Sequence, residues 1–531
     1  MASQPENWTW RDRAEGSIPQ GRVLDPNVEP VPGIQAYPTV YVPDRLLVTD
    51  ETGERVEHLR RLSETAETFG WAIELETLRG EPLPGLEVEP DPLVPGVPGV
   101  TRVRVLAPGA APDADSPLAP DAWRLLQRAR RLSQSKLTGV GLDHVLSIDP
   151  VGVNPFTTTN PFIPTNPFIP TNPFIPTNPY GAAEYERAGS GGRQPIMRLG
   201  AGPVRGVPPK AGRRRTVVAI LDTGCGEHNW LPDEIVTREL EIDGEPIGLT
   251  DEADPEVYGD LYGQMDGELD SIAGHGTFIA GIVRQIAPEA NLVSVRLADA
   301  RGLVDESLLV RTLAEVIELA RRDRAGEGDG TPIDVLSLSL GYYHETPEDG
   351  LYSHTVYELL RVARGLGIAV VCSAGNDAVD RPTFPASLWA WPGSDNGIAP
   401  DELAPHVSVG ALNPGRTSVA LFSNVGPWVR AYAPGAAVVS AFPAFVGGRQ
   451  PATREDAYAR RRQTIAVEDY TGTFAIWSGT SFAAPFVAGM IAVEHGAPSM
   501  RRASRKVWIE RSRTATKAAL EVVDRDDRSA E

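Results

Sequence analysis

From Thr216 onward, short apolar runs alternate with longer segments whose apolar residues recur at helical spacing. The run TVVAILD is continuously apolar, which is typical of a parallel strand buried on both faces. Four more strand-like runs follow it, LVSVRLAD, IDVLSLSLG, IAVVCSAG and HVSVGALN. The helical segments are HGTFIAGIVRQIA, VDESLLVRTLAEVIELARRDRA, TVYELLRVARGLG and SFAAPFVAGMIAVEHG. This alternation predicts an α/β domain with a doubly wound, mostly parallel sheet over residues 216–525.

Residues 37–150 have a different pattern. VYVPDRLLVTD, WAIELETL, VTRVRVL and GLDHVLSI are strand-like, whereas ERVEHLRRLSETAETFG and APDAWRLLQRARRL are helical. The first helical segment ends on Gly70, a good helix stop. The resulting order, β-α-β-β-α-β, predicts a ferredoxin-like α+β domain. Residues 1–36 are polar and rich in Gly and Pro, which indicates a loose arm, and residues 526–531 are interpreted as a polar tail.

A repeat lies between these two domains. The tripeptide NPF, which becomes NPY at its last occurrence, begins at Asn154, Asn160, Asn166, Asn172 and Asn178. The repeated unit NPFIPT has a proline at two of six positions, which blocks helices and sheet ladders and predicts an extended chain. The composition favours a stiff spacer, and the alternative is a docking strip that offers phenylalanines to a partner protein. Gly- and Arg-rich sequence follows, so residues 151–215 are interpreted as a linker.

The formal net charge of −21 argues against two classes of partner. Nucleic acid and anionic membrane surfaces would both repel so acidic a chain. No apolar stretch has the length of about 18 residues that a membrane span needs, and MASQPENWTWRDRAEGS lacks the basic start and apolar run of a secretory signal. We therefore expect a cytoplasmic protein. The only cysteines, Cys225 and Cys372, provide no disulfide framework and are expected to be buried thiols.

Three short segments carry the residue types of a nucleophilic serine site. Asp222 ends the first apolar strand, His275 lies in GHGT, and Ser481 lies in GTS. The carboxyl end of a parallel strand is where open α/β sheets bind ligands, and a helix N-terminus favours the negative charge of an oxyanion. Serine is a poor nucleophile until a base removes its proton, and a histidine oriented by a carboxylate can do so near neutral pH.

Five segments resemble the signature sequences of the subtilase family of serine peptidases. They read AILDTG, GHGTFIAG, SLSLG, SAGND and SGTSFAAPFVAG, within residues 216–224, 274–281, 337–341, 373–377 and 478–489. The chain order Asp, His, Ser is that of subtilisin and differs from the orders in chymotrypsin and in the α/β-hydrolases. The resemblance implies a subtilisin-like fold for the second half of the chain.

The resemblance also implies roles for individual residues. The implied catalytic residues are Asp222, His275 and Ser481 as a triad and Asn376 as the side-chain oxyanion donor, with the Ser481 amide as the second donor. Two segments are implied to bind substrate. They are Ser339, Leu340 and Gly341, which would pair with the substrate as an added strand, and Ser373, Ala374 and Gly375, which would line the side-chain pocket. The element order at 37–150 resembles that of subtilase propeptides, which act as folding chaperones and inhibitors.

The segment 239–270 contains twelve Asp or Glu and neither Lys nor Arg. Such a run is usually a solvated loop. Two functional interpretations stay open, which are calcium binding and the attraction of basic substrates. We expect no required cofactor, and nothing in the spacing of the acids locates a calcium site.

These observations predict a serine endopeptidase that cleaves protein or peptide substrates through an acyl-enzyme intermediate. In one form of this hypothesis, residues 37–150 keep the enzyme latent. The alternative is a binding protein that has lost catalysis and uses the NPF repeat as a docking strip. The presence of all four matched groups, Asp222, His275, Ser481 and Asn376, argues against the alternative.

Overall fold

The computed structural model describes residues 5–15, 21–50, 53–108, 118–148, 185, 192–198, 201–263, 269–346, 354–446, 454–463, 469–499 and 503–528. The NPF repeat lies outside these residues, so the spacer and the docking strip both stay predictions. No helix in the described ranges is long and apolar enough to cross a lipid bilayer.

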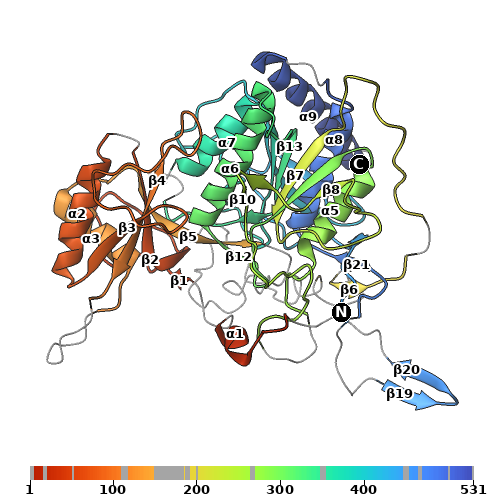
Figure 1. Cartoon of the computed structure of the whole chain (residues 1–531), viewed down its shortest axis with the longest axis horizontal. Helices are drawn as coiled ribbons and strands as arrows, with labels where there is room; N and C mark the ends of the chain where they lie inside the picture. The colour runs from red at the N-terminus through yellow and green to blue at the C-terminus, as the bar shows by residue number, and fades with distance from the viewer. Residues whose placement is uncertain are drawn as a thin grey trace.

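A parallel sheet forms the centre of the second half of the chain (Figure 1). Its strand order is β17-β16-β15-β13-β7-β11-β8, and every neighbouring pair is parallel. The strands are β7 (Val217–Asp222), β8 (Val236–Thr237), β11 (Asn291–Arg296), β13 (Val335–Leu338), β15 (Ala369–Ser373), β16 (His406–Leu412) and β17 (Ala431–Pro434). The predicted doubly wound, mostly parallel sheet is therefore confirmed.

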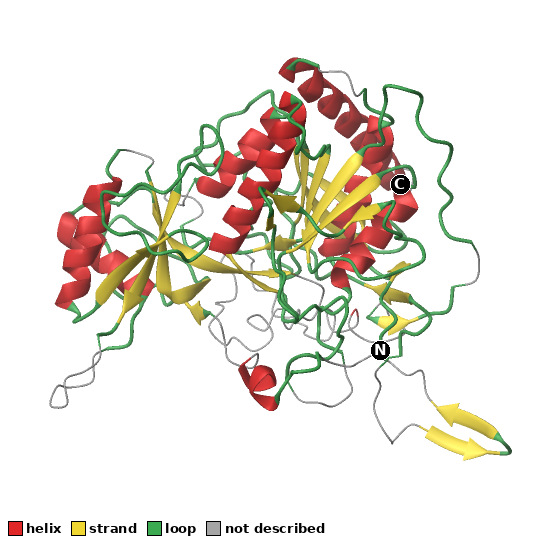
Figure 2. Ribbon diagram, viewed as in Figure 1, coloured by secondary structure: helices red, strands yellow, loops and turns green. Residues whose placement is uncertain are grey.

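Helices cover both faces of this sheet (Figure 2). They are α5 (His275–Ile286), α6 (Glu306–Ala325), α7 (Thr355–Gly365), α8 (Thr480–His495) and α9 (Arg505–Arg528). Because side chains alternate along a strand, Ala219 and Leu221 of β7 pack in one apolar cluster with α6 and α7, whereas Val218 and Ile220 pack in a second cluster with α5, α8 and α9. Two separate cores thus fix β7, which ends on Asp222, from both sides.

A smaller antiparallel sheet is built from the N-terminal half. Its elements are β1 (Arg22–Val23), β2 (Val40–Thr49), α2 (Arg55–Thr68), β3 (Ala72–Glu76), β4 (Val100–Leu106), α3 (Ala122–Ser133) and β5 (Val140–Ile148). From β2 onward they follow the order β-α-β-β-α-β, with the strands arranged β5-β2-β4-β3. Leu46 and Val48 face α2 and α3, whereas Leu47 between them packs into the cluster that contains α6. The small sheet therefore shares a core with the larger domain.

Strand β5 also pairs with two strands that come from the second half of the chain. These are β12 (Leu303–Asp305) and β14 (Leu340–Gly341), and both run antiparallel to β5. The sequence analysis did not predict this pairing. It means that residues 37–148 and the α/β domain are joined by backbone ladders as well as by a common core.

The remaining elements are short. They are α1 (Trp10–Glu15), β6 (Gln194–Pro195), β9 (Glu241–Ile242), β10 (Glu245–Pro246), β18 (Val438–Ala441), β19 (Arg454–Ala457), β20 (Arg460–Gln463) and β21 (Phe474–Trp477). Helix α1 lies in the N-terminal arm, where Arg13 forms an ion pair with Asp260 at 2.8 Å.

Asp334, which immediately precedes β13, is the most heavily paired buried carboxylate next to the sheet. Its oxygens accept bonds from the Val217 amide at 3.0 Å and from Arg214, Arg324 and Arg511. Its side chain is fully buried. Desolvation raises its pKa, but the hydrogen bond and charge of Arg214, with the charges of His495 and Arg324, outweigh desolvation and hold the pKa well below the usual range.

We predict that Asp334→Ala lowers the free energy of unfolding by about 3–5 kcal/mol, because it leaves partly buried arginines without their counter-charge and the buried Val217 amide without its acceptor. The matched control is Asp329→Ala, whose exposed carboxylate pairs with Arg322 and should contribute less than about 1 kcal/mol. Urea denaturation of both variants measures the difference, and similar midpoints would contradict the assignment.

Candidate active site

Asp222 and His275 are brought together by the end of β7 and the start of α5. His275 Nδ1 lies 2.7 Å from Asp222 Oδ1, and both side chains are fully buried. The same carboxylate oxygen accepts the Thr223 amide at 2.8 Å. Gly224 then adopts a φ of +107°, a backbone conformation that turns the chain away from the strand and that favours glycine. Two of the three predicted triad residues are thus in direct contact.

Ser481 lies in the first turn of α8 and is fully buried. Its hydroxyl is 3.5 Å from the Ser339 carbonyl oxygen, and its own carbonyl accepts the Ser339 hydroxyl at 3.0 Å. The ring of the next residue, Phe482, lies 5.2 Å from the ring of His275. Among the described residues, His275 Nε2 has no hydrogen-bond partner, so Ser481 and His275 are not hydrogen-bonded, although the residue after Ser481 packs against His275. Catalytic hydrogen bonds are often loose in the absence of substrate.

Asn376 is held against the N-terminus of α8. Its side-chain oxygen accepts the Thr480 amide at 2.8 Å, and the Thr480 hydroxyl accepts the Gly375 amide at 3.1 Å. Since the oxygen of the Asn376 amide accepts this bond, its nitrogen is the end that can donate to an oxyanion. This contact therefore holds the predicted oxyanion donor against Thr480, the residue that precedes Ser481.

The two predicted substrate-binding segments differ in their surroundings. Ser373 ends β15, and the carbonyl of Ala374 accepts bonds from Thr383 and Asn424 at 3.0 and 2.9 Å. Leu340 and Gly341 form β14, which pairs with Ile148 and Ser147 of β5.

The end of β5 lies between β14 on one side and the backbone of residues 302 and 303 on the other. The Ile148 amide donates to the Gly302 carbonyl at 2.8 Å, and Ser147 is the register partner of Leu303 in β12. Strand β5 thus pairs with Leu340 and Gly341, two of the three residues predicted to pair with a substrate strand.

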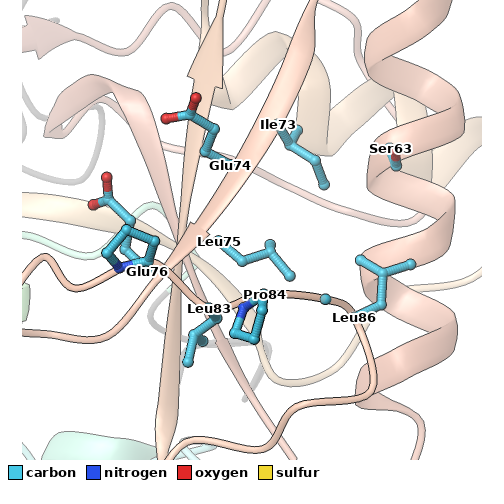
Figure 3. Close-up of a pocket in the computed structure, with 10 residues that line it drawn as sticks. Ser63, Ile73, Glu74, Leu75, Glu76, Leu83, Pro84 and Leu86 are labelled. Carbon is cyan, nitrogen blue, oxygen red and sulfur yellow. The ribbon is translucent and has the colours of Figure 1, made fainter.

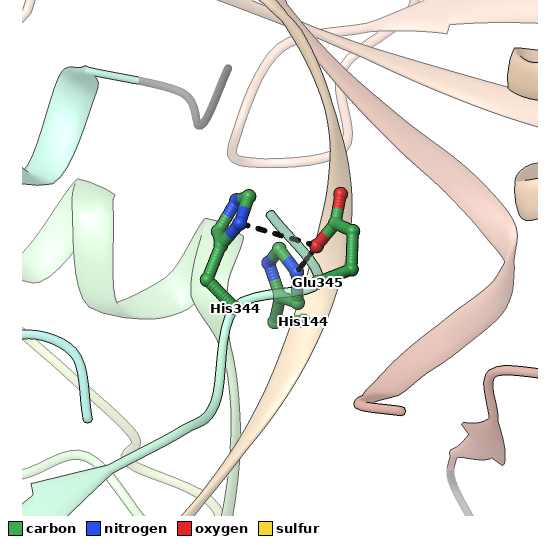
Figure 4. A group of neighbouring side chains, drawn as sticks. All are labelled: His144, His344 and Glu345. Carbon is green, nitrogen blue, oxygen red and sulfur yellow. Dashed lines mark hydrogen bonds and ion pairs between the residues drawn. The ribbon is translucent and has the colours of Figure 1, made fainter. Parts of the chain in front are cut away.

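A group of ionisable side chains crosses the contact between β5 and the α/β domain (Figure 4). His144 of β5 lies 2.5 Å from Glu306 through Nδ1 and 2.7 Å from Glu345 through Nε2. His344 is also adjacent, with Nδ1 3.4 Å from Glu345, and this nitrogen accepts the Thr346 amide. Burial lowers the pKa of His144, but the charges of Glu345 and Glu306 outweigh burial and raise it to about 10.

The residue types of His144, His344 and Glu345 are those of a metal site, and their ligand atoms lie within 4.8 Å of one another. The lone pair of His344 Nδ1 is already used by the Thr346 amide. The contacts instead suit an imidazolium held between two carboxylates. The sequence did not indicate this group, because its members come from separate segments without a motif.

The acidic segment 239–270 contributes ion pairs within the protein. Asp243 pairs with Arg322 at 2.8 Å and Asp251 with Arg296 at 2.7 Å. One member, Glu256, is buried beside Asp222 and His275, and the sequence analysis did not single it out. No group of acids from the described part of this segment meets the geometry of a metal site.

Two further features lie apart from the chemistry of the site. A depression between α2, β3 and the loop 82–86 is lined by Ser63, Ile73 and Leu86 among others, and it contains none of the predicted site residues (Figure 3). Cys225 and Cys372 are free and buried as predicted, and burial raises the pKa of Cys225 to about 12.

Comparison with known proteins identifies the family. The model of the subtilase family matches residues 213–527, which is more than half of the chain, and the chain therefore belongs to this family. It is 28% identical over 292 residues to an intracellular serine protease of Paenibacillus polymyxa, which covers 53% of this chain and 66% of the relative. It is 30% identical over 301 residues to the serine protease AprX of Bacillus subtilis (strain 168), which covers 52% and 56% respectively.

The chain thus spans less than two thirds of the length of these relatives. Among solved structures it is similar to a lanthipeptide protease, at 19% identity and a TM-score of 0.36, over 57% of this chain and 87% of that one.

Proposed function

We propose that this chain is a serine endopeptidase in which Asp222, His275 and Ser481 act as a triad. The observation that carries the proposal is the buried contact between His275 Nδ1 and Asp222 Oδ1, with Ser481 in the first turn of the adjacent helix. Membership of the subtilase family and the names of the two relatives, both serine proteases, support it.

The proposed reaction has two stages. Ser481 Oγ attacks the peptide carbonyl while His275 Nε2 accepts its proton, and Asp222 stabilises the imidazolium through Nδ1–H. The Asn376 side chain and the Ser481 amide donate to the oxyanion, helped by the N-terminus of α8. The intermediate collapses, His275 gives its proton to the leaving amine, and an acyl-enzyme remains. Water, deprotonated by His275, then releases the acid and restores Ser481.

The substrate would be an extended peptide strand. The backbone of Leu340 and Gly341 would pair with it on one side and Gly302 and Leu303 on the other, while Ser373 to Gly375 would line the side-chain pocket. These assignments follow from the positions of β14 and β12. The backbone groups that a substrate strand would pair with are the ones that already pair with β5.

We further propose that residues 37–148 keep the enzyme latent. β5 pairs with β14 and β12 as a substrate strand would, so substrate can bind only after β5 leaves. Several polar contacts stabilise this docked state. Asp143 accepts the Ser307 amide and hydroxyl at 2.9 Å each, and His144 bridges Glu306 and Glu345. The rival role as a binding protein depends on the NPF repeat, on which the described residues do not bear.

The first prediction tests the nucleophile. Ser481→Ala should abolish peptide hydrolysis and covalent labelling by a fluorophosphonate, because the change removes the proposed nucleophile. Circular dichroism and the melting temperature should remain those of the parent protein. Turnover retained by the pure variant would refute the assignment.

The second prediction concerns the oxyanion. Removing one such donor costs roughly 2.7–4 kcal/mol of transition-state stabilisation, so Asn376→Ala should lower kcat by about 100- to 1000-fold. KM should change little, because the interaction strengthens only as the oxyanion forms. Steady-state kinetics separate the two constants, and an effect mainly on KM would contradict this role.

The third prediction concerns latency and pH. In the docked state the pKa of His144 is about 10, above the ordinary 6.5, so docking takes up a proton. The contribution of this proton to the stability of the docked state is complete below about pH 6.5. It declines as the pH rises toward 10, and the equilibrium constant for docking falls by up to about tenfold per pH unit. Asp143, whose pKa burial raises to about 7, has largely lost its proton above that pH. Between pH 7.5 and 9 the full chain should therefore become progressively easier to label.

The ratio of labelling rates of the parent chain and His144→Gln isolates this effect, since the titration of His275 is common to both. The labelling rate of the parent chain divided by that of His144→Gln should be lowest at pH 7.5 and rise toward 1 at pH 9. His58→Gln, in α2 of the same unit, serves as the control and should label like the parent. A ratio that does not vary with pH would exclude His144 from latency.

A further inference from the structure

Helix α5, which carries His275 as its first residue, lacks an N-cap side chain of its own. The N-cap is Gly274, with a φ of +80°, and it provides no capping hydrogen bond. The first amides of a helix have no intrahelical acceptors and need partners from elsewhere. Since these amides belong to the turn that holds His275, whatever accepts them also fixes the imidazole.

The acceptor is the carboxylate of Glu256, from the acidic segment 239–270. Its Oε1 accepts the Gly276 amide at 2.9 Å, and its Oε2 accepts the Thr277 amide at 3.3 Å and the Thr277 hydroxyl at 2.5 Å. The side chain is only 3% exposed. A buried carboxylate at this end of α5 also interacts favourably with the positive end of the helix dipole.

The same carboxylate reaches the other half of the pair through Thr223. The Thr223 hydroxyl donates to Glu256 Oε1, lies within hydrogen-bond distance of Asp222 Oδ1 at 3.2 Å, and accepts the Gly276 amide at 2.8 Å. The Thr223 amide donates to Asp222 Oδ1 at 2.8 Å. Glu256 is therefore connected to His275 through α5 and to Asp222 through Thr223.

Two properties of this arrangement make the identity of Glu256 matter. The groups that bond to the carboxylate are all donors, and they are the amides of Gly276 and Thr277 and the hydroxyls of Thr277 and Thr223. The side chain at this position must therefore accept hydrogen bonds and carry no N–H groups of its own. The two segments also approach closely, since a Cβ on Gly276 would lie 2.0 Å from the Gly224 carbonyl oxygen. Small changes in the donor–acceptor match would therefore displace one segment against the other.

We infer that Glu256 is a positioning residue that sets the contact between His275 and Asp222. It thereby orients His275, the proton acceptor of the proposed peptidase. The inference deepens the proposed function and rests on it for its kinetic consequence only. The carboxylate itself does not touch the substrate.

The primary test does not require activity. In full-length protein carrying Ser481→Ala, the His275 Nδ1 proton bonded to Asp222 should give a low-field proton NMR resonance, assigned by its loss in Asp222→Asn. Glu256→Gln should shift or broaden this resonance, because an amide N–H₂ then faces other donors. Glu252→Gln, an exposed member of the same acidic segment, is the matched control and should leave it unchanged.

A second pair of variants keeps the test decisive if Glu256→Gln folds poorly. Thr223→Ala removes the hydroxyl that connects Glu256 with the Asp222 segment and should shift the resonance, whereas Thr223→Ser retains the hydroxyl and should preserve it. In protein with an intact Ser481, Glu256→Gln should lower kcat at least tenfold with KM nearly unchanged.

Two outcomes separate the inference from the proposed function. An unchanged resonance and an unchanged kcat in Glu256→Gln and Thr223→Ala, even with a lower melting temperature, would overturn the positioning role and reduce Glu256 to a structural cap. A shifted resonance together with failure to label even when β5 is displaced, as in Ile148→Pro, would uphold the role of Glu256 and refute the peptidase.

Discussion

The contact between His275 and Asp222 depends on how the fold places the end of β7 and the start of α5. Asp222 stands at the end of β7, which is held by apolar clusters on both faces of the sheet, and His275 begins α5, which packs in one of those clusters. Because protein interiors are close-packed, neither element can shift without disturbing its core. The cost of burying the carboxylate is offset by the Thr223 amide and the imidazole, both of which bond to Oδ1. The proposed general base is thus oriented before any substrate binds.

The second constraint is the pairing of β5 with β12 and β14. Backbone ladders of this kind recognise shape and direction and depend little on sequence, so under the proposal a strand of the same chain takes the place of a peptide substrate. Side chains then set the strength of the contact. Leu146 and Ile148 pack in the cluster shared with α6, while Asp143 and His144 use Ser307, Glu306 and Glu345. The residues that order the proposed triad differ from those that dock β5, so under the proposal β5 can leave without disturbing the triad.

The sequence predicted the parts of the fold that follow from local patterns. The parallel strands were recognisable because burial on both faces requires continuous apolar runs, as in TVVAILD. The motif residues were found because the proposed nucleophile, base and carboxylate each lie at a strand end or a helix start. Helix α9 was not predicted, although its buried positions Ser512, Ala515, Ala519 and Val523 recur at helical spacing. Small side chains such as Ser and Ala give that spacing little hydrophobic contrast.

Other features could not be predicted because they depend on contacts between distant segments. β12 and β14 have three and two residues, too short for any periodicity, and only the folded chain brings them to β5. Glu256 lies in a segment in which six of the ten described acids are exposed, and its burial depends on where the Asp222 and His275 segments meet. His144 likewise acquires its neighbours Glu306 and Glu345 only across the contact between the two sheets.

The central claim is that an assembled site is covered by its own β5 strand, and the rate of fluorophosphonate labelling of the full chain tests it most directly. Ile148→Pro removes the amide that donates to Gly302, and Ile148→Val keeps it. The account predicts that Ile148→Pro labels at least tenfold faster than the parent, that Ile148→Val labels like the parent, and that adding Ser481→Ala abolishes labelling in both. Equal labelling rates for Ile148→Pro and the parent chain would contradict the account.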